Sequence, residues 1–173
     1  FDTKLLGECN IYNIAAAVAL ARKLGIGMSA IQHAVSELGY VEHRLEMKLH
    51  RDMVLIDDAF NANPEGAAAA CDVLAQMPGW RILVTPGMID LGEQQEQFNR
   101  CLGTHAAGCA DEVILVGGKQ VQPLRQGLLE GGFDEDRIGQ VMTMQEAFAC
   151  FEQSPHADKV VLIENDVPDV LNR

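Results

Sequence analysis

The fold is decided by the stretch Met53–Ala70, which reads MVLIDDAFNANPEGAAAA. It opens with the continuous apolar run Met53–Ile56, the pattern of a strand that is buried on both faces of a sheet. A polar loop follows, and then a helix with Pro64 in its first turn and four alanines that allow close packing on a sheet. A buried strand followed by such a helix is the basic unit of a parallel α/β sheet.

The same rhythm continues along the chain. Apolar runs predict strands at Arg81–Thr85, Glu112–Val116, Gln140–Met142 and Val160–Ile163. Amphipathic patterns predict helices at Pro64–Met77, Gln94–Ala107, Gln120–Glu130 and Met144–Phe151. Before them, Leu45–His50 alternates apolar and polar residues and precedes the turn Arg51-Asp52, which indicates a half-exposed antiparallel strand. The sequence therefore predicts an α/β fold with a mostly parallel sheet and helices on both faces.

The first forty residues have a different texture. An alanine-rich helix is predicted at Asn10–Leu24, because Gly25 follows as a C-terminal signal. Ser29 is a favourable N-cap for a second helix that runs to about Leu38. The composition changes between Gly39 and Arg44, and we predict a domain boundary there, with residues 1–42 helical and residues 43–173 forming the α/β unit.

Composition excludes several classes of partner. The chain has 13 basic and 25 acidic residues and a net charge of −12, which argues against a nucleic-acid surface. No apolar run is long enough to span a bilayer, so membrane insertion is not expected. The five cysteines and five histidines lack the spacing of a zinc site, and we predict no metal ligands. Unpaired cysteines of this kind are typical of a reducing cytoplasm.

Polar residues gather where the first buried strand ends, and ligands bind beyond such carboxyl ends in open parallel sheets. Asp57 and Asp58 can accept hydrogen bonds from ribose hydroxyls or bind a cation, and Asn61 and Asn63 precede a helix N-terminus that favours anions. Asn63 is equally well suited to be the N-cap before a helix. The run Gly117-Gly118-Lys119 lacks the spacing of a phosphate-binding loop and indicates a tight turn.

Three segments resemble motifs of the Mur ligases, in the same order. They are GECNIYNIAA at 7–16, DDAFNANP at 57–64 and MIDLGE at 88–93. The second is the most specific, and it is similar to the motif of the branch that adds D-alanyl-D-alanine to a UDP-muramoyl tripeptide. The resemblance implies a C-terminal Rossmann-like domain, preceded by a short helical segment from a central ATPase domain. It also implies an ATP-dependent amide-bond ligase of peptidoglycan synthesis that uses ATP and Mg²⁺ and works through an acyl phosphate.

The resemblance implies four ATP-binding residues. Asn10 and Asn13 match the two asparagines that face the adenine. Arg44, in the segment His43-Arg44-Leu45-Glu46, matches the arginine that reaches the nucleotide, and Asp58 matches the carboxylate that holds the ribose. These positions lie on both sides of the predicted boundary, so nucleotide binding is expected to draw two domains together.

The same resemblance implies residues on the substrate side of the site. Asn61 and Asn63 match positions that line the cleft where amine and acyl phosphate meet. Three departures from the family pattern leave the amine open: Cys9 stands in place of histidine, Gly87 in place of aspartate, and Glu164-Asn165-Asp166 in place of a Lys-Gly-Ser-like turn. A UDP-muramoyl peptide and an amino acid or dipeptide are the expected substrates.

The sequence contains no Gly-x-x-x-x-Gly-Lys-Ser/Thr loop and starts with Phe1. We therefore expect a portion of a longer ligase that is inactive alone, that has no catalytic residue of its own and whose partners are the N-terminal and central domains of the same protein. Two alternatives remain open. One is a ligase of the same fold with another acceptor, of the peptide-recycling, folylpolyglutamate or cyanophycin type. The other is a non-catalytic Rossmann-like binding module or partner subunit.

Overall fold

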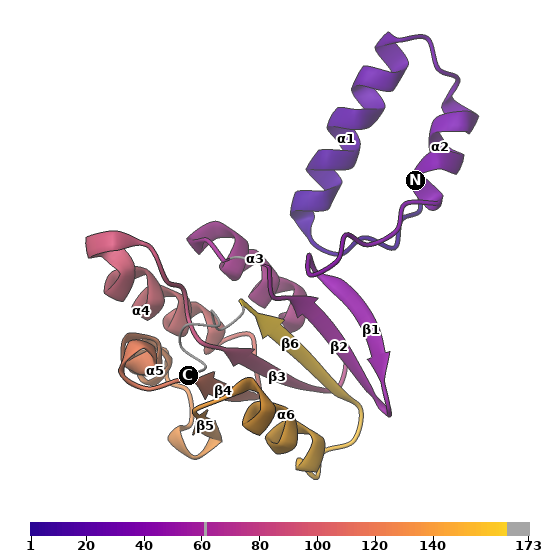
Figure 1. Cartoon of the computed structure of the whole chain (residues 1–173). Helices are drawn as coiled ribbons and strands as arrows, with labels where there is room; N and C mark the ends of the chain where they lie inside the picture. The colour runs from indigo at the N-terminus through magenta and orange to yellow at the C-terminus, as the bar shows by residue number, and fades with distance from the viewer. Residues whose placement is uncertain (61, 166–173) are drawn as a thin grey trace.

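The computed structural model describes residues 1–60 and 62–165, in which a pair of helices precedes an α/β unit (Figure 1). The α-helices are α1 (Glu8–Lys23), α2 (Met28–Ser36), α3 (Pro64–Ala75), α4 (Gln95–Ala106), α5 (Gln122–Glu130) and α6 (Met144–Gln153). The strands are β1 (Glu46–His50), β2 (Met53–Asp58), β3 (Trp80–Thr85), β4 (Glu112–Val116), β5 (Ile138–Val141) and β6 (Lys159–Glu164). Short 3-10 turns are η1 (Gly92–Gln94), η2 (Lys119–Val121) and η3 (Glu135–Arg137).

The sheet has the strand order β1-β2-β6-β3-β4-β5. β1 is antiparallel to β2, and all other neighbours are parallel, which confirms the predicted mostly parallel sheet. The last strand of the described chain, β6, lies between β2 and β3. Residues from positions near 58, 85 and 164 are consequently brought to one edge of the sheet, where carboxyl ends meet.

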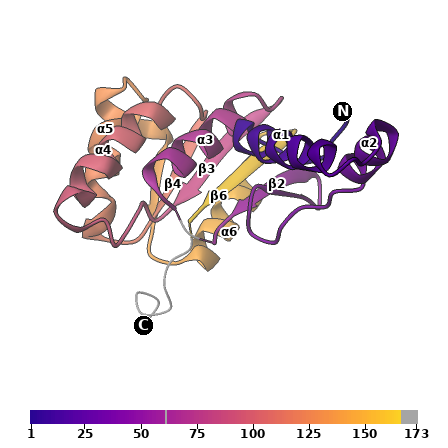
Figure 2. The same ribbon diagram turned by 90° about the horizontal axis from the view of Figure 1, so that it is seen from above.

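Helices cover both faces of the sheet, as predicted. Figure 2 shows α6 on the opposite side of the sheet from α3. One core cluster joins the sheet to α3, α4 and α5 through Ala70, Leu74, Leu102, Leu124 and Leu128. The other joins it to α6 through Ala147 and Phe151. Because successive strand residues point to opposite faces, strands buried on both sides are apolar throughout, as β6 is between Val160 and Ile163.

The α1–α2 pair extends away from the sheet near the end of β2 (Figure 1). α1 has no buried residue, and α2 buries Ile31 and Val35. The foot of α1 is anchored to the α/β unit: a Cβ atom at Gly7 would lie 2.9 Å from Leu45 and 3.5 Å from Val73, so the chain passes tightly against the α/β unit there. The predicted domain boundary between residues 42 and 43 falls just beside this anchor and remains a prediction.

Some predicted element ends were wrong. Ser29 is not the N-cap of α2, because the helix already begins at Met28 after an extended Gly27 and has no side-chain cap. β5 begins at Ile138, two residues before the prediction, because pairing with β4 extends an otherwise polar segment. Among the described residues, no helix is long and apolar enough to cross a membrane.

Candidate functional site

The two adjacent carboxylates at the end of β2 hold the segment that enters β1. Asp58 Oδ1 accepts a hydrogen bond from the Leu45 backbone N–H at 2.9 Å. Asp57 Oδ2 accepts one from His43 Nδ1, also at 2.9 Å. Successive strand residues point to opposite faces, so the segment is held from both sides. The residue between these two anchor points is Arg44.

This segment has an unusual backbone. His43 has a φ of 58° and Leu45 a φ of 47°, a left-handed conformation that residues other than glycine rarely adopt. Each such residue costs about 1–3 kcal/mol, and the Asp-Asp contacts offset this cost. The exposed Arg44 guanidinium lies over the Phe60 ring, 4.4 Å from its centroid. The arginine is therefore presented to solvent from a fixed backbone and over an aromatic platform.

The structure brings Arg44 and Asp58, two residues that the family resemblance implies in ATP binding, close to each other. Burial raises the pKa of Asp58, and the Leu45 N–H, a hydrogen bond from Glu164 and the charge of Arg44 act against that rise. Glu164 comes from the end of β6 and is the register partner of Asp58 on the neighbouring parallel strand. Glu164 directly follows the strand predicted at Val160–Ile163 and also departs from the family pattern. Its pairing with Asp58 was not predicted, because nothing in the sequence reveals that β6 lies beside β2.

Glu164 is 1% exposed, and its Oε2 atom has no hydrogen-bond partner among the described residues. Burial, followed by the nearby charge of Asp58 and the hydrogen bond to it, raises the pKa of Glu164 well above its ordinary value of 4.5. Burial and the neighbouring carboxylate both disfavour the charged form of Glu164. The protonated form of Glu164 is therefore favoured, and it can donate a hydrogen bond to Asp58.

Asp57 behaves differently from its neighbour. Burial alone would raise the pKa of Asp57, but hydrogen bonds from Lys48 and His43 outweigh it and hold the pKa below the usual range. Lys48 Nζ lies 2.9 Å from Asp57 Oδ2 and 2.9 Å from a carboxylate oxygen of Glu46. Lys48 was not predicted from the sequence. It lies two residues from Glu46, the register partner of Asp57, and so it shares a face of the sheet with both. Asp57 thus acts as an anionic anchor for β1.

The asparagines that the family resemblance singles out lie on different elements. Asn63 caps α3: its Oδ1 accepts from the Gly66 N–H at 2.8 Å, with Pro64 in the first turn. Asn61 lies outside the described residues. Asn10 donates from Nδ2 to the Leu6 carbonyl at 2.7 Å and is half-buried, whereas Asn13 is exposed.

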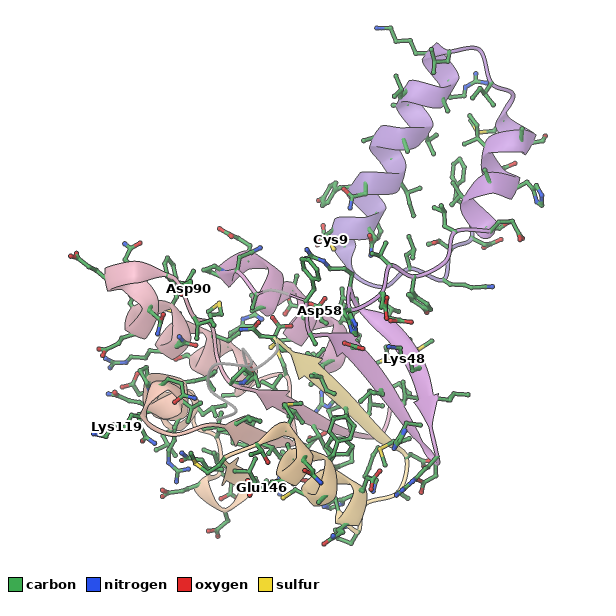
Figure 3. All side chains as sticks on the ribbon, viewed as in Figure 1. Cys9, Lys48, Asp58, Asp90, Lys119 and Glu146 are labelled. Atoms are coloured by element: carbon green, nitrogen blue, oxygen red, sulfur yellow. The ribbon has the colours of Figure 1, made fainter. Side chains whose placement is uncertain are left out.

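The foot of α1 lies close to the end of β2. Figure 3 shows Asp58 below the foot of α1, which carries Cys9. The contact of Gly7 with Leu45, whose N–H binds Asp58, links these two regions in the structure. Asn10 and Asn13, on α1, therefore lie in a part of the molecule that neighbours Arg44 and Asp58.

The neighbouring strand ends form a fixed rim. Asn165 Nδ2 donates to the Gly87 carbonyl at 2.8 Å, which joins the end of β6 to the end of β3. Asn99 brackets Met88, accepting from its N–H at 2.7 Å and donating to its carbonyl at 2.8 Å. Gly87 has a φ of 78°, and a Cβ atom there would lie 2.5 Å from Asn99 Oδ1. This packing explains physically why glycine occupies position 87.

Gly117-Gly118-Lys119 is a tight turn, in agreement with the prediction. The Gly117 carbonyl accepts from Gln140 Nε2 at 2.8 Å, and the Gly118 N–H donates to Gln120 at 3.0 Å. Lys119 lines an open groove of about 840 Å³ between α4 and α5, together with Arg100. Figure 3 shows Lys119 far from Asp58, so this groove belongs to a different part of the surface.

Comparison with known proteins places these residues in context. A model of the Mur ligase glutamate ligase domain matches residues 43–166. The chain is 38% identical over 117 residues to the UDP-N-acetylmuramoyl-tripeptide–D-alanyl-D-alanine ligase of Escherichia coli (strain K12), which covers 67% of this chain and 26% of that protein.

Solved structures give the same picture. MurF from Acinetobacter baumannii matches with a TM-score of 0.77 and 25% identity, over 94% of this chain and 36% of that one. The MurF ligase of Thermotoga maritima in complex with ADP matches with a TM-score of 0.78 over 96% of this chain and 37% of that one; at 19% identity it supports the fold alone. The chain spans about a quarter of the length of the Escherichia coli relative.

Proposed function

The chain belongs to the Mur ligase family, and on that premise we propose that it is the nucleotide-closing part of an ATP-dependent amide-bond ligase. The proposed ligase adds a dipeptide such as D-alanyl-D-alanine to a UDP-muramoyl peptide in the cytoplasm, and its activity belongs to the complete parent protein. When bound, ATP supplies the phosphoryl group that turns the substrate carboxylate into an acyl phosphate, and the amine then displaces phosphate. The chain itself binds, orients and excludes water.

The observation that carries this proposal is the proximity of Arg44 and Asp58, which is close enough for the charge of Arg44 to lower the pKa of Asp58. The guanidinium suits a phosphate or an adenine face, because it is always charged and planar. Asp58 keeps carboxylate lone pairs beyond those that Leu45 and Glu164 occupy, and these suit ribose hydroxyls. A nucleotide that contacts both residues would draw this unit towards the domain that holds its phosphates.

The remaining contacts of the nucleotide are assigned to α1. Asn10 and Asn13 lie one helical turn apart and so share a face of α1. Both lie close to the anchor at Gly7, which contacts Leu45. We assign the adenine to this face, because asparagine amides both donate and accept hydrogen bonds. Asn61 and Asn63 are assigned to the substrate side, where the cap at Asn63 leaves its amide Nδ2 available.

The described residues gather no set of three carboxylates that would hold Mg²⁺ without the nucleotide. Mg²⁺ prefers oxygen ligands at octahedral geometry. The one group of three or more potential ligands in the described ranges, 1–60 and 62–165, contains a thiol and an imidazole. We therefore assign Mg²⁺ to the other part of the parent protein.

The exposed surface of α1 supports a partner domain in the same parent protein. Ile11, Tyr12, Leu20 and Leu24 are each at least 60% exposed. Large apolar side chains gathered on one short helix are a typical interface feature. We assign this surface to the central ATP-binding domain, to which residues 1–42 would belong.

The experiment is steady-state kinetics of the complete ligase with ATP as the varied substrate. Arg44→Ala and Asp58→Asn are each expected to raise KM for ATP about tenfold, the equivalent of roughly 1.4 kcal/mol, because each removes a nucleotide contact. Arg51→Ala is the matched control: Arg51 is an exposed arginine at the other end of β1, paired with Glu152, and its loss should leave KM unchanged. If both site variants keep the wild-type KM for ATP, the proposed nucleotide site is wrong.

The amine is tested on the same enzyme with a panel of amino acids and dipeptides. D-alanyl-D-alanine is expected to give the highest kcat/KM. A higher value for glutamate or a folate substrate would keep the ligase assignment but replace the proposed substrate.

A further inference from the structure

Three potential metal ligands converge on the side of the α/β unit covered by α3 and α4. Asp72 lies in the last turn of α3, His105 in the last turn of α4, and Cys109 in the turn that follows α4. Each offers one ligand atom, and these atoms all lie within 4.8 Å of one another. His105 Nε2 is 2.8 Å from Asp72 Oδ1, and the Cys109 thiol donates to the His105 carbonyl at 3.4 Å.

The sequence alone gave no sign of this group. His105 and Cys109 are four residues apart, but their third partner, Asp72, comes from another helix. α3 rises about 1.5 Å per residue, so Asp72 lies roughly 12 Å along the helix from Pro64, at the opposite end from the Asn63 cap. The group is therefore separate from the proposed nucleotide site.

The local field favours a cation. Both α3 and α4 end beside the group, and a helix C-terminus carries a partial negative charge. A cationic group already binds at this end, because Arg81 Nη1 donates to the carbonyl of Ala75, the last residue of α3. The charge of Arg81 is balanced by Asp111, which it contacts through Nε at 2.8 Å and Nη2 at 2.9 Å. Little net repulsion therefore remains for a second cation.

The three potential metal ligands differ in solvent exposure. The side chains of Asp72 and His105 are 59% and 41% exposed, whereas Cys109 is only 5% exposed. An ion can reach the two outer ligands from solvent, while the sulfur lies on the inner side. A site built in this manner leaves room for a water molecule as a fourth ligand.

We propose that Asp72, His105 and Cys109 form a binding site for a divalent transition metal ion of the zinc type, which joins the ends of α3 and α4. One thiolate, one imidazole and one carboxylate are the ligands that Zn²⁺ and Co²⁺ accept and that Mg²⁺ and Ca²⁺ do not favour. In a tetrahedral zinc site the sulfur and nitrogen ligands are about 3.5 Å apart. A small rotation of the side chains is thus enough to close the site. Binding releases the thiol proton of Cys109, and His105 exchanges its hydrogen bond with Asp72 for the metal.

The test is a titration of the reduced, metal-free chain with Co²⁺, followed by the thiolate-to-cobalt charge-transfer absorption in the near ultraviolet. One equivalent is expected to bind, with displacement by Zn²⁺ and release of a proton. Cys109→Ser should abolish the absorption, and His105→Ala and Asp72→Asn should each weaken binding by about tenfold or more, because each removes a ligand. The absence of a saturable absorption band in the wild-type chain would overturn the proposal.

Two controls keep the result interpretable. Cys101→Ser and Cys150→Ser remove exposed cysteines and should leave the titration unchanged; loss of the signal in either one would assign the metal elsewhere and refute the proposed site. Because Cys109 is buried, its variant has a risk of misfolding, but His105 and Asp72 are exposed and their variants should fold. Zn²⁺ is expected to raise the Tm of the wild type and not that of His105→Ala, and equal shifts in both would also refute the site.

Discussion

α1 and α3 are both alanine-rich helices, yet the structure uses them in opposite ways. α3 buries Ala67, Ala70, Cys71, Val73 and Leu74 against the sheet, whereas α1 buries no residue at all. Their compositions are similar because alanine favours any helix. The difference lies in the partner: α3 has a sheet face beneath it, and α1 has none among the described residues. Composition therefore predicts the helix, and only its surroundings decide its burial.

The largest expected effect comes from shortening a core leucine. Leu74→Ala in α3 should lower the free energy of unfolding by about 2–5 kcal/mol, because Leu74 is fully buried. Leu20→Ala in α1, where the side chain is 60% exposed, should change it by less than about 0.5 kcal/mol. Urea denaturation of both variants measures the contrast. A similar loss in both would mean that α1 is packed within the cooperative unit.

The second prediction makes a side chain larger, where Leu74→Ala makes one smaller. Ala70→Leu should destabilise the chain by about 1–3 kcal/mol, because Ala70 is 0% exposed and a larger side chain must displace the sheet. Ala16→Leu, at an exposed position of α1, is the matched control and should be nearly neutral. The Tm of each variant tests this prediction, and a tolerated leucine at position 70 would contradict the close packing of α3.

Glu164, a buried acid close to α3, gives the stability of the chain a pH dependence. The pKa of Glu164 is raised, so the folded chain keeps a proton that the unfolded chain releases near its ordinary pKa of 4.5. Its contribution to stability is complete below that value and is lost as the pH rises towards the folded pKa, by up to about 1.4 kcal/mol per pH unit.

Glu164→Gln should therefore flatten the fall in Tm above pH 4.5 and be at least as stable as the wild type at neutral pH, since the amide can still donate to Asp58. Glu37→Gln, on the exposed C-cap of α2, should leave the wild-type slope intact. Thermal melts between pH 4.5 and 8 provide the measurement. An unchanged slope in Glu164→Gln would show that Glu164 is ionised in the folded chain.

The smallest effect concerns helix caps. Asn63→Ala should cost about 1 kcal/mol, because it removes the bond from the Gly66 N–H that caps α3. Ser29→Ala should cost almost nothing, because Ser29 lies inside the first turn of α2 and makes no cap. Chemical denaturation measures the free energy of unfolding of both variants. An equal loss in both would mean that Ser29 does cap α2, as the sequence suggested.

Much of the fold was predictable because its signals are local. Continuous apolar runs located β2, β3, β4 and β6 to within about two residues, and the Asn63-Pro64 pair marked the start of α3. β5 was placed too late, because the segment from Ile138 to Val141 contains little apolar pattern and is defined by its pairing with β4. The proximity of Arg44 and Asp58 was expected from the family resemblance. Local residue patterns alone do not show that two residues distant in the chain meet in space.

The sequence by itself determined the helices and strands, the mostly parallel sheet and the family, because each depends on local periodicity or on motifs that are contiguous in the chain. Only the tertiary structure decided that β6 lies beside β2, which pairs Glu164 with Asp58, and that α3 and α4 end together, which gathers Asp72, His105 and Cys109. The raised pKa of Glu164 also follows from burial and from a neighbour 106 positions away, as the numbers 58 and 164 show. Such properties depend on distances in space, and a linear chain does not contain them.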